Sequence, residues 1–148
     1  MIVGEDLIAV AEKYAAGECE ADWRSAVSRA YYGAFHAARD FLVMLGFDPP
    51  KAEHAHAYLW RRLSSSEIGS LASTGVRLNQ LRGERNRADY DLFRTVRRMD
   101  AVAATDSARR ISNELRGLTK DEQLRVTEAI RRYETDVLLE PTWRRLPR

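Results

Sequence analysis

The sequence contains a single cysteine and no long apolar run. Cys19 is the one cysteine among 148 residues, so a disulfide within the chain is excluded. This cysteine usage is typical of a reducing compartment, and the acidic residues 1–6 lack the basic start of a secretory signal, so we expect a cytoplasmic protein. No apolar stretch approaches the roughly 18–20 residues that a membrane-spanning helix needs, which predicts no membrane association.

The sequence also lacks the residue patterns of most enzyme and metal sites. It has three histidines, and His54 and His56 are two residues apart, which on a helix places them roughly 200° apart and prevents them from binding one metal ion together. Phosphate-binding glycine loops, nucleophile elbows and the paired histidines of zinc proteases are absent as well. We therefore expect neither a metal nor a cofactor.

Signals for β-strands are missing, and the chain shows helical periodicity throughout. Alternating apolar and polar residues do not persist anywhere, and no Asn-Gly or Asp-Gly hairpin turn occurs. Pro49 and Pro50 give the clearest break between helices. We predict an all-α fold, a bundle of five to six helices with an up-and-down core and an extra C-terminal helix. The expected helices cover residues 5–16, 20–45, 51–63, 67–90, 96–116 and 119–139.

The apolar positions within these segments predict which side chains form the core. Gly46 ends the pattern of the second helix, and Thr119 with Glu122 has the spacing of a capping box that opens the last one. Helix by helix, the expected core residues are Leu7, Val10, Ala11 and Tyr14; Trp23, Val27, Ala30, Ala34, Ala37, Phe41 and Leu45; Leu71, Leu78 and Leu81; Val96, Met99, Val102, Ile111 and Leu115; and Val126, Ile130, Tyr133 and Val137.

Charge is concentrated in one region although the net charge is only +2. Residues 77–98 contain seven arginines against three acidic residues, whereas residues 1–22 contain six acidic residues and one lysine. A focused positive region is expected of a site that binds a polyanion, and a solvated helix face is the other interpretation. Lysine is scarce, with three among 24 basic residues, and this pattern does not separate the two interpretations.

Within this region, residues 81–91 combine three arginines with three acidic residues and a tyrosine. Arg82, Arg85 and Asp89 are neighbours on a helix at spacings of three and four, and Asn86 and Tyr90 form an adjoining row. Guanidinium groups make paired, charge-assisted hydrogen bonds to phosphate oxygens, so the cluster favours a phosphate or RNA site. The alternative is an intrahelical Arg85–Asp89 ion pair with Tyr90 packed at the helix end.

The second expected helix carries a polar row beside its apolar face. Ser28, Tyr32, His36 and Asp40 are four residues apart and share one side of the helix. One interpretation is a polar seam that bonds to a neighbouring helix. The other makes Tyr32 and His36 the inner wall of a pocket shared with the fourth helix.

Two motifs in this order resemble the HEPN superfamily, in particular its small stand-alone prokaryotic members. The first is SAVSRAYYGAFHAARDFL at residues 25–42, and the second is RNRADYD at residues 85–91. The resemblance covers residues 5–117. We accordingly expect a HEPN-like helical domain over residues 1–118, a C-terminal helix over residues 119–140 that packs on the same domain, and a basic tail over residues 141–148. The tail around Trp143 is expected either to clamp a dimer partner or to be frayed.

The resemblance implies a helical bundle that forms a homodimer and brings two copies of an Arg-x4–6-His motif into one cleft. In active members this cleft cuts RNA without a metal, the arginine stabilising the phosphate charge and the histidine assisting attack by the ribose 2′-hydroxyl. Many such proteins are toxins paired with an antitoxin of nucleotidyltransferase fold.

Matched residue by residue, Arg85 takes the place of the motif arginine and Asn86 that of the polar residue after it, while the histidine position falls at Tyr90. Tyrosine, with an ordinary pKa of about 10, is a poor general base at pH 7 but donates hydrogen bonds. His36 is the candidate to replace the missing histidine. We therefore take Arg85, Tyr90 and His36 as the candidate catalytic residues. The candidate phosphate-binding residues are Arg82, Arg85, Asn86, Arg87 and Tyr32.

Three functions remain open on the sequence. The first is a protein of a toxin–antitoxin-like system that binds RNA or a nucleotide phosphate at a dimer cleft, with metal-independent ribonuclease activity that depends on Tyr90. The second is a non-catalytic interaction or nucleotide-binding subunit that partners a nucleotidyltransferase-fold protein. The third is a structural bundle in which the charged motif only ties helices together.

Overall fold

The computed structural model describes residues 1–144 and is helical, as the sequence predicts. Residues 1–144 contain no β-strand, and an isolated bridge pairs Phe47 with Trp143. None of the helices in this part of the chain is long and apolar enough to cross a membrane. The helices are α1 (Gly4–Ala15), α2 (Glu20–Leu45), α3 (His54–Ser64), α4 (Gly69–Tyr90), α5 (Arg98–Arg116) and α6 (Lys120–Tyr133), which continues as the π-helical segment Glu134–Leu138.

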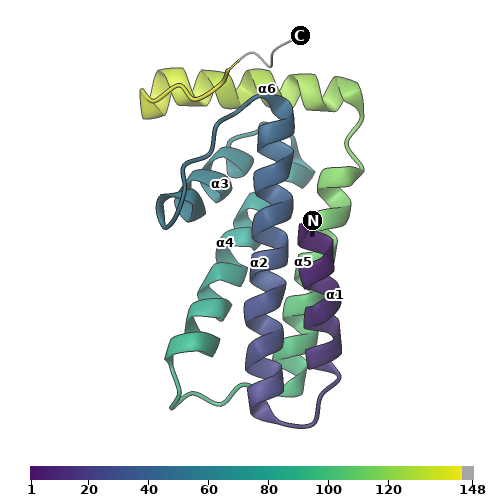
Figure 1. Ribbon diagram of the computed structural model, residues 1–148. Coiled ribbons are helices and arrows are strands. Elements are labelled where there is room, and N and C mark those ends of the chain that lie inside the picture. The colour runs from purple at the N-terminus through teal and green to yellow at the C-terminus, as the bar shows by residue number, and fades with distance from the viewer. Residues whose placement is uncertain (145–148) are drawn as a thin grey trace.

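Helix α2 is the centre of the bundle. Helices α1, α2, α4 and α5 run up and down along one axis, α3 lies beside the upper part of α4, and α6 crosses the end of the bundle (Figure 1). Helix α2 contacts α1, α3, α4 and α5, because small residues line its buried faces. Ala30, Ala34 and Ala38 are fully buried, which confirms the close approach that the alanines predict.

The contact between α1 and α2 depends on two glycines. A Cβ atom added at Gly4 would lie 2.3 Å from the Gly33 carbonyl oxygen, and one at Gly33 would lie 2.5 Å from the Ile8 side chain. These distances are far below van der Waals contact, so larger residues at either position would force the helices apart. Because the two backbones meet in this way, Ile8 is completely buried in the core.

The expected inner faces of α1 and α5 are partly wrong. Val10 and Tyr14 are exposed on α1, where Ile8 and Ala15 point inward instead. On α5 the expected core residues Met99 and Val102 are 67% and 42% exposed. The side of α5 that faces the bundle carries small residues, namely Ala101, Ala104, Thr105 and Ala108. Because the helices pack closely, small residues occupy the buried face of α5, and the larger apolar residues point to the surface.

The predicted buried face of α6 is correct over most of the helix but wrong at its C-terminal end, for a different reason. The capping box of Thr119 and Glu122 is confirmed, and Val126 and Ile130 are buried as expected. The π-helical segment that follows winds more residues into each turn, which shifts the register of the face. Val137 is consequently 65% exposed.

The shifted register buries Glu134 instead of an apolar residue. Its carboxylate oxygen Oε2 accepts from Nε of Arg62 in α3 at 2.7 Å, and its Oε1 accepts from the backbone N–H of Thr142 at 3.0 Å. The guanidinium carbon of Arg62 lies 3.4 Å from the ring centroid of Tyr58. This buried pair joins α3 to the C-terminal helix.

The division into a domain over residues 1–118 and an extension over residues 119–140 stays a prediction.

The segment around Trp143 packs on its own chain. The indole Nε1 of Trp143 donates to the Leu45 carbonyl at 3.0 Å, and the Arg144 backbone N–H donates to Gly46 at 2.7 Å. Gly46 adopts a φ of 105°, and a Cβ there would lie 2.8 Å from the indole nitrogen. The described part of the tail therefore covers the end of α2 and is not frayed, and its role as a clamp on a dimer partner stays a prediction. The rest of the predicted basic tail, residues 145–148, lies outside the described residues.

Candidate phosphate-binding site

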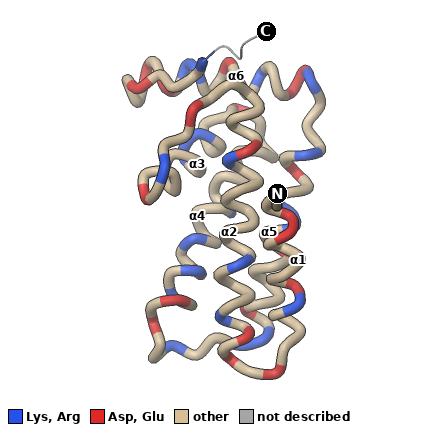
Figure 2. Tube along the Cα trace, viewed as in Figure 1, with Lys and Arg blue, Asp and Glu red and all other residues tan. Residues whose placement is uncertain are grey.

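The polar row of α2 faces α4. Ser28 donates to Oδ2 of Asp89 at 3.1 Å, and Arg85 Nη2 donates to the Tyr32 hydroxyl at 2.7 Å. The two helices are antiparallel, so Tyr32, one turn after Ser28 on α2, pairs with Arg85, one turn before Asp89 on α4. Two helical turns of polar contacts thus hold the second sequence motif against the first. Figure 2 shows basic positions along α4 and on the neighbouring part of α2.

Arg85 is held on several sides but keeps unused donors. Its side chain is 14% exposed, and Nη1 donates to Oδ1 of Asn86 at 3.0 Å. The Nε atom lies 2.9 Å from Oδ2 of Asp89, an ion pair by distance, yet its N–H has no hydrogen-bond partner of good geometry in residues 1–144. The guanidinium carbon lies 5.0 Å from the ring centroid of Tyr32 and 5.4 Å from that of Tyr90. A guanidinium offers five N–H groups, so this arrangement fixes its position without saturating it.

The purely structural interpretation of this motif predicts an Arg85–Asp89 ion pair and a Tyr90 side chain packed at the helix end. The structure contains the ion pair but not the packed tyrosine. The Arg85–Asp89 pair is present at the i,i+4 spacing. Tyr90, however, is 73% exposed and does not pack at the helix end. Its ring lies at the open side of Arg85, where it offers an aromatic face and a hydroxyl donor to solvent.

Arg24 of α2 fixes the end of α4, and the sequence alone does not single it out. Its Nη1 donates to the carbonyl oxygens of Ala88 at 2.8 Å and Asp91 at 3.0 Å, both at the C-terminal end of α4. Its side chain is 13% exposed and pairs with Glu20 at 2.9 Å. A cation at this position satisfies the free carbonyls of the last turn and interacts favourably with the helix dipole. Arg24 therefore holds the Arg85 motif in place.

The remaining basic candidates divide between two faces of α4. Arg82 lies one turn before Arg85 on the same face, and the guanidinium carbon of Arg29 lies 5.3 Å from the Tyr32 ring centroid. Arg87 instead lines a separate groove of about 620 Å³ between α4 and α5, together with Arg77 and Arg94.

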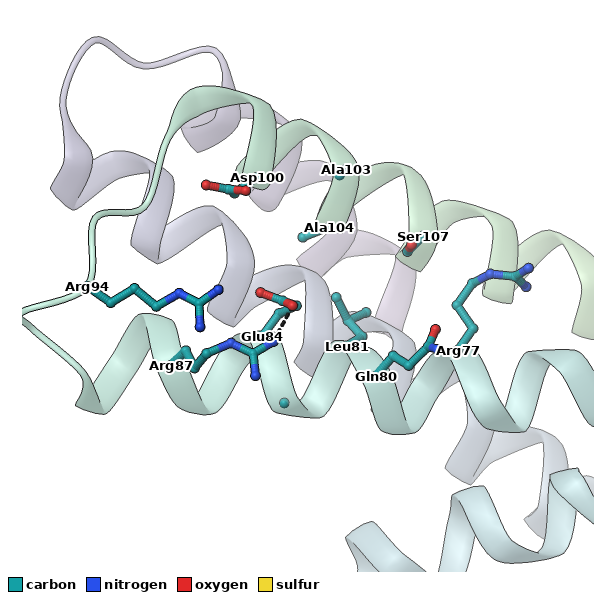
Figure 3. A pocket seen from close by; sticks show the side chains of 11 residues that line it. Arg77, Gln80, Leu81, Glu84, Arg87, Arg94, Asp100, Ala103, Ala104 and Ser107 are labelled. Carbon is teal, nitrogen blue, oxygen red and sulfur yellow. Dashed lines mark hydrogen bonds and ion pairs between the residues drawn. The ribbon is translucent and has the colours of Figure 1, made fainter.

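Figure 3 shows this second groove at close range. Arg87 and Arg94 point toward Glu84, and Arg87 forms an ion pair with that carboxylate. Arg77 pairs with Glu114 at 3.3 Å. The structure therefore separates Arg87 from the Arg85 site, and carboxylates offset much of the positive charge in the groove.

His36 and His56 take different places around Tyr32. Continuing the register of α2 against α4 places His36 one turn beyond Tyr32, and no hydrogen bond joins it to Arg85 in the described part of the chain. His56 of α3, for which the sequence suggests no role beyond an excluded metal site, lies in an aromatic cluster with Tyr31, Tyr32 and Phe35. Its ring centroid is 5.6 Å from that of Tyr31, 6.5 Å from that of Tyr32 and 5.0 Å from that of Phe35.

The environment of His56 disfavours its charged form. Burial, and after it the positive charges of Arg82 and Arg85, lower the pKa of His56 below its ordinary value of 6.5, while Glu53 acts weakly in the opposite direction. The same charges reach Tyr31, but burial dominates there and raises the pKa of the Tyr31 hydroxyl. The imidazole is therefore neutral at pH 7.

A metal centre is not apparent in this part of the chain. Residues 1–144 contain no group of three or more histidine, cysteine or acidic side chains placed to hold a metal ion.

Comparison with known proteins identifies the family. A model of the HEPN domain matches residues 5–118, which run from α1 to the loop after α5 and include both sequence motifs and the Arg85 site. No curated protein and no solved structure matches the chain. The resemblance seen in the two motifs is thus confirmed, and the chain belongs to the HEPN domain family.

Proposed function

We propose that this HEPN protein binds RNA, with Arg85 as the side chain that holds a phosphate. The observation that carries the proposal is the state of the Arg85 guanidinium. It is positioned by the Tyr32 hydroxyl, by Asn86 and by its ion pair with Asp89, and each Nη makes one hydrogen bond within residues 1–144, which leaves a second N–H on each Nη for a ligand. A phosphate oxygen can take the place of the Asn86 amide at small cost, because Asn86 is exposed. Positioning an arginine in advance lowers the entropy lost on binding.

The surroundings of Arg85 fit a single strand of RNA. Tyr90 presents an exposed ring beside the guanidinium, and aromatic side chains stack on unpaired bases. Arg82, one turn away on the same face, adds positive charge along the path of the backbone. Asn86 and Tyr90 orient the phosphate by hydrogen bonding. Arg87 contributes only long-range attraction, since it lies in the groove on the other side of α4.

The test is a binding titration with a short fluorescent oligouridylate in EDTA at pH 7. Replacing Arg85 by Ala should weaken binding about tenfold or more, because a hydrogen-bonded charge pair with phosphate is lost. Arg132→Ala is the matched control, since Arg132 is an exposed arginine on α6 paired with Glu67. Equal affinities for the wild type and Arg85→Ala would reject the proposal.

Metal-independent cleavage of RNA is the second candidate function. It is favoured by the position of Tyr90, which occupies the place of the motif histidine and lies beside Arg85 with an exposed hydroxyl. In this reaction Arg85 neutralises the phosphate charge and Tyr90 donates a hydrogen bond to a phosphate oxygen. Incubation with RNA in EDTA should give fragments that disappear in the Tyr90→Phe variant. Intact RNA at high protein concentration would leave binding as the function.

We further propose that two copies form the binding cleft and that the partner in the cell is a nucleotidyltransferase-fold antitoxin. HEPN domains commonly dimerise. In this chain the loop that follows Tyr90 carries Leu92 and Phe93, which are 75% and 104% exposed. Light scattering of the wild type and of Phe93→Ser tests the dimer, and a monomeric wild type would exclude it. Co-purification with the product of the neighbouring gene tests the partner.

The alternative is a non-catalytic subunit whose cleft binds a nucleotide rather than RNA. The same titration separates the two, because an oligouridylate without terminal phosphates presents only phosphodiesters. Preference for a nucleoside triphosphate over the oligonucleotide would favour the alternative.

A further inference from the structure

We propose that His56 is a phosphate-binding residue, and that Tyr31 holds its ring in the tautomer that presents Nε2–H to the ligand beside Arg82 and Arg85. The inference rests on the proposed function, because the ligand is the RNA phosphate that Arg85 binds. It assigns a role to a histidine from α3, outside both sequence motifs.

The hydrogen bond between Tyr31 and His56 fixes the tautomer. The Tyr31 hydroxyl and His56 Nδ1 are hydrogen-bonded, and this is the one bond that the hydroxyl makes within residues 1–144. Tyr31 is 1% exposed, so a phenol proton that pointed elsewhere would be buried without a partner. The hydroxyl therefore donates to Nδ1, and a neutral imidazole that accepts at Nδ1 carries its proton on Nε2.

The free nitrogen of this ring reaches solvent. His56 Nε2 makes no hydrogen bond to the described residues, and it is not among their buried unpaired atoms. The ring as a whole is half-buried. The imidazole thus has one nitrogen fixed in the core and the other available as a donor at the surface.

Two arginines lie close enough to the His56 ring to act on it electrostatically. Tyr32 links the histidine to one of them, because its ring lies edge-on to the His56 ring with centroids 6.5 Å apart and its hydroxyl accepts a hydrogen bond from Arg85 at 2.7 Å. Arg82 has no ion pair with any carboxylate in residues 1–144, and its Nε is buried without a partner. Two guanidinium groups and a neutral N–H donor are suited to an anion, and Glu53 is the one acid that acts on the ring.

A protonated histidine is not required for this role. Burial and the two arginines keep the ring uncharged, so it binds as a dipole donor with little dependence on pH near neutrality. The nearby charges that govern its titration are Arg82, Arg85 and Glu53, and the nearby phenols are Tyr31 and Tyr32. A phosphate bound beside them would make the Nε2–H bond stronger by adding negative charge.

The test combines binding with nitrogen NMR of the full chain. His56→Ala should weaken oligouridylate binding about tenfold, the loss expected for a hydrogen bond to a charged group, and His56→Gln should recover part of it through its amide donor. His54→Ala is the control, because His54 is exposed two residues away on the same helix. In the wild type, long-range proton–nitrogen correlation should show the Nε2–H tautomer for His56, and the oligonucleotide should shift the Nε2–H signal.

The outcomes separate this inference from the proposed function. If Arg85→Ala weakens binding while His56→Ala behaves like His54→Ala, the role of His56 is rejected and RNA binding at Arg85 stands. An Nδ1–H tautomer in the wild type also rejects it. If His56→Ala lowers the melting temperature, His56→Gln and the NMR shift decide the question. If the wild-type protein binds no oligouridylate, both proposals fail.

Discussion

Two arginine–carboxylate pairs of this bundle differ in burial and in hydrogen bonding. In the Arg62–Glu134 pair the side chains are 4% and 1% exposed, and both Glu134 oxygens accept further hydrogen bonds from Thr142. In the Arg85–Asp89 pair the side chains are 14% and 28% exposed, and the Arg85 Nε–H lacks a well-aligned partner. The first pair is closed and holds elements together, whereas the second is partly exposed, and we propose that its arginine binds a ligand. On this proposal, burial and the number of satisfied hydrogen bonds, rather than the presence of an ion pair, distinguish a structural arginine from a binding one.

The largest effect should follow from breaking the closed pair. Glu134→Ala leaves the Arg62 guanidinium buried without a counter-charge, and we expect unfolding free energy to fall by about 3–5 kcal/mol. Chemical denaturation measures the change. Glu67→Ala is the control, because the exposed Arg132–Glu67 pair should contribute about 0.2–1 kcal/mol. Equal effects of the two variants would contradict the structural role of Glu134.

An intermediate effect is expected at Arg24, which caps α4 from α2. Arg24→Met keeps the alkyl chain but removes the donors to Ala88 and Asp91, and should lower the unfolding free energy by about 2 kcal/mol. Hydrogen exchange should rise in the last turn of α4 before it rises elsewhere. Unchanged protection in that turn would show that Arg24 does not hold the motif.

A smaller, pH-dependent effect is expected from His56. Its pKa is lower in the folded protein than its ordinary value of 6.5, so the unfolded chain takes up a proton first as the pH falls. The stability contributed by the neutral ring is complete above about pH 6.5, and it is lost as the pH falls toward the folded-state pKa. Melting curves between pH 7.5 and 5 should therefore fall more steeply for the wild type than for His56→Gln. Parallel curves would contradict this environment of His56.

The smallest effect on stability should come from removing the Arg85–Asp89 pair. Arg85→Ala removes a partly exposed i,i+4 pair and one hydrogen bond to Tyr32, and we expect a loss of about 1 kcal/mol or less. Denaturation under the conditions used for Glu134→Ala checks it. A loss as large as that of Glu134→Ala would make Arg85 a structural residue and remove the contrast between the pairs.

Local patterns predict the parts of the fold that local forces determine. Helix α2 begins and ends as expected, because its apolar repeat is regular and Gly46 supplies the positive φ that ends it. The exposure of Met99 on α5 was not predictable in this way, since it depends on how closely a neighbouring helix approaches. The π-helical turn that buries Glu134 depends on Arg62, a partner 72 residues away in the sequence.

The sequence motifs predict which side chains of α2 and α4 face each other, but not which residues of other elements join the site. The spacing of Ser28 and Tyr32 on one helix and of Arg85 and Asp89 on another gave the correct facing rows. His56 lies on a third helix, and no spacing rule connects it to either motif. Arg87 lies inside the second motif, two residues after Arg85, yet the 100° turn per helical residue places it in another groove.

The most direct test of the central claim is the salt dependence of RNA binding by the wild type and Arg85→Ala. Each phosphate contact to a single strand contributes about 0.7 to the slope of log affinity against log salt concentration. The account predicts that Arg85→Ala binds more weakly and with a slope shallower by about that amount, while its melting temperature stays close to that of the wild type. An unchanged affinity and slope, accompanied by a marked fall in melting temperature, would show that Arg85 ties helices together and does not bind phosphate.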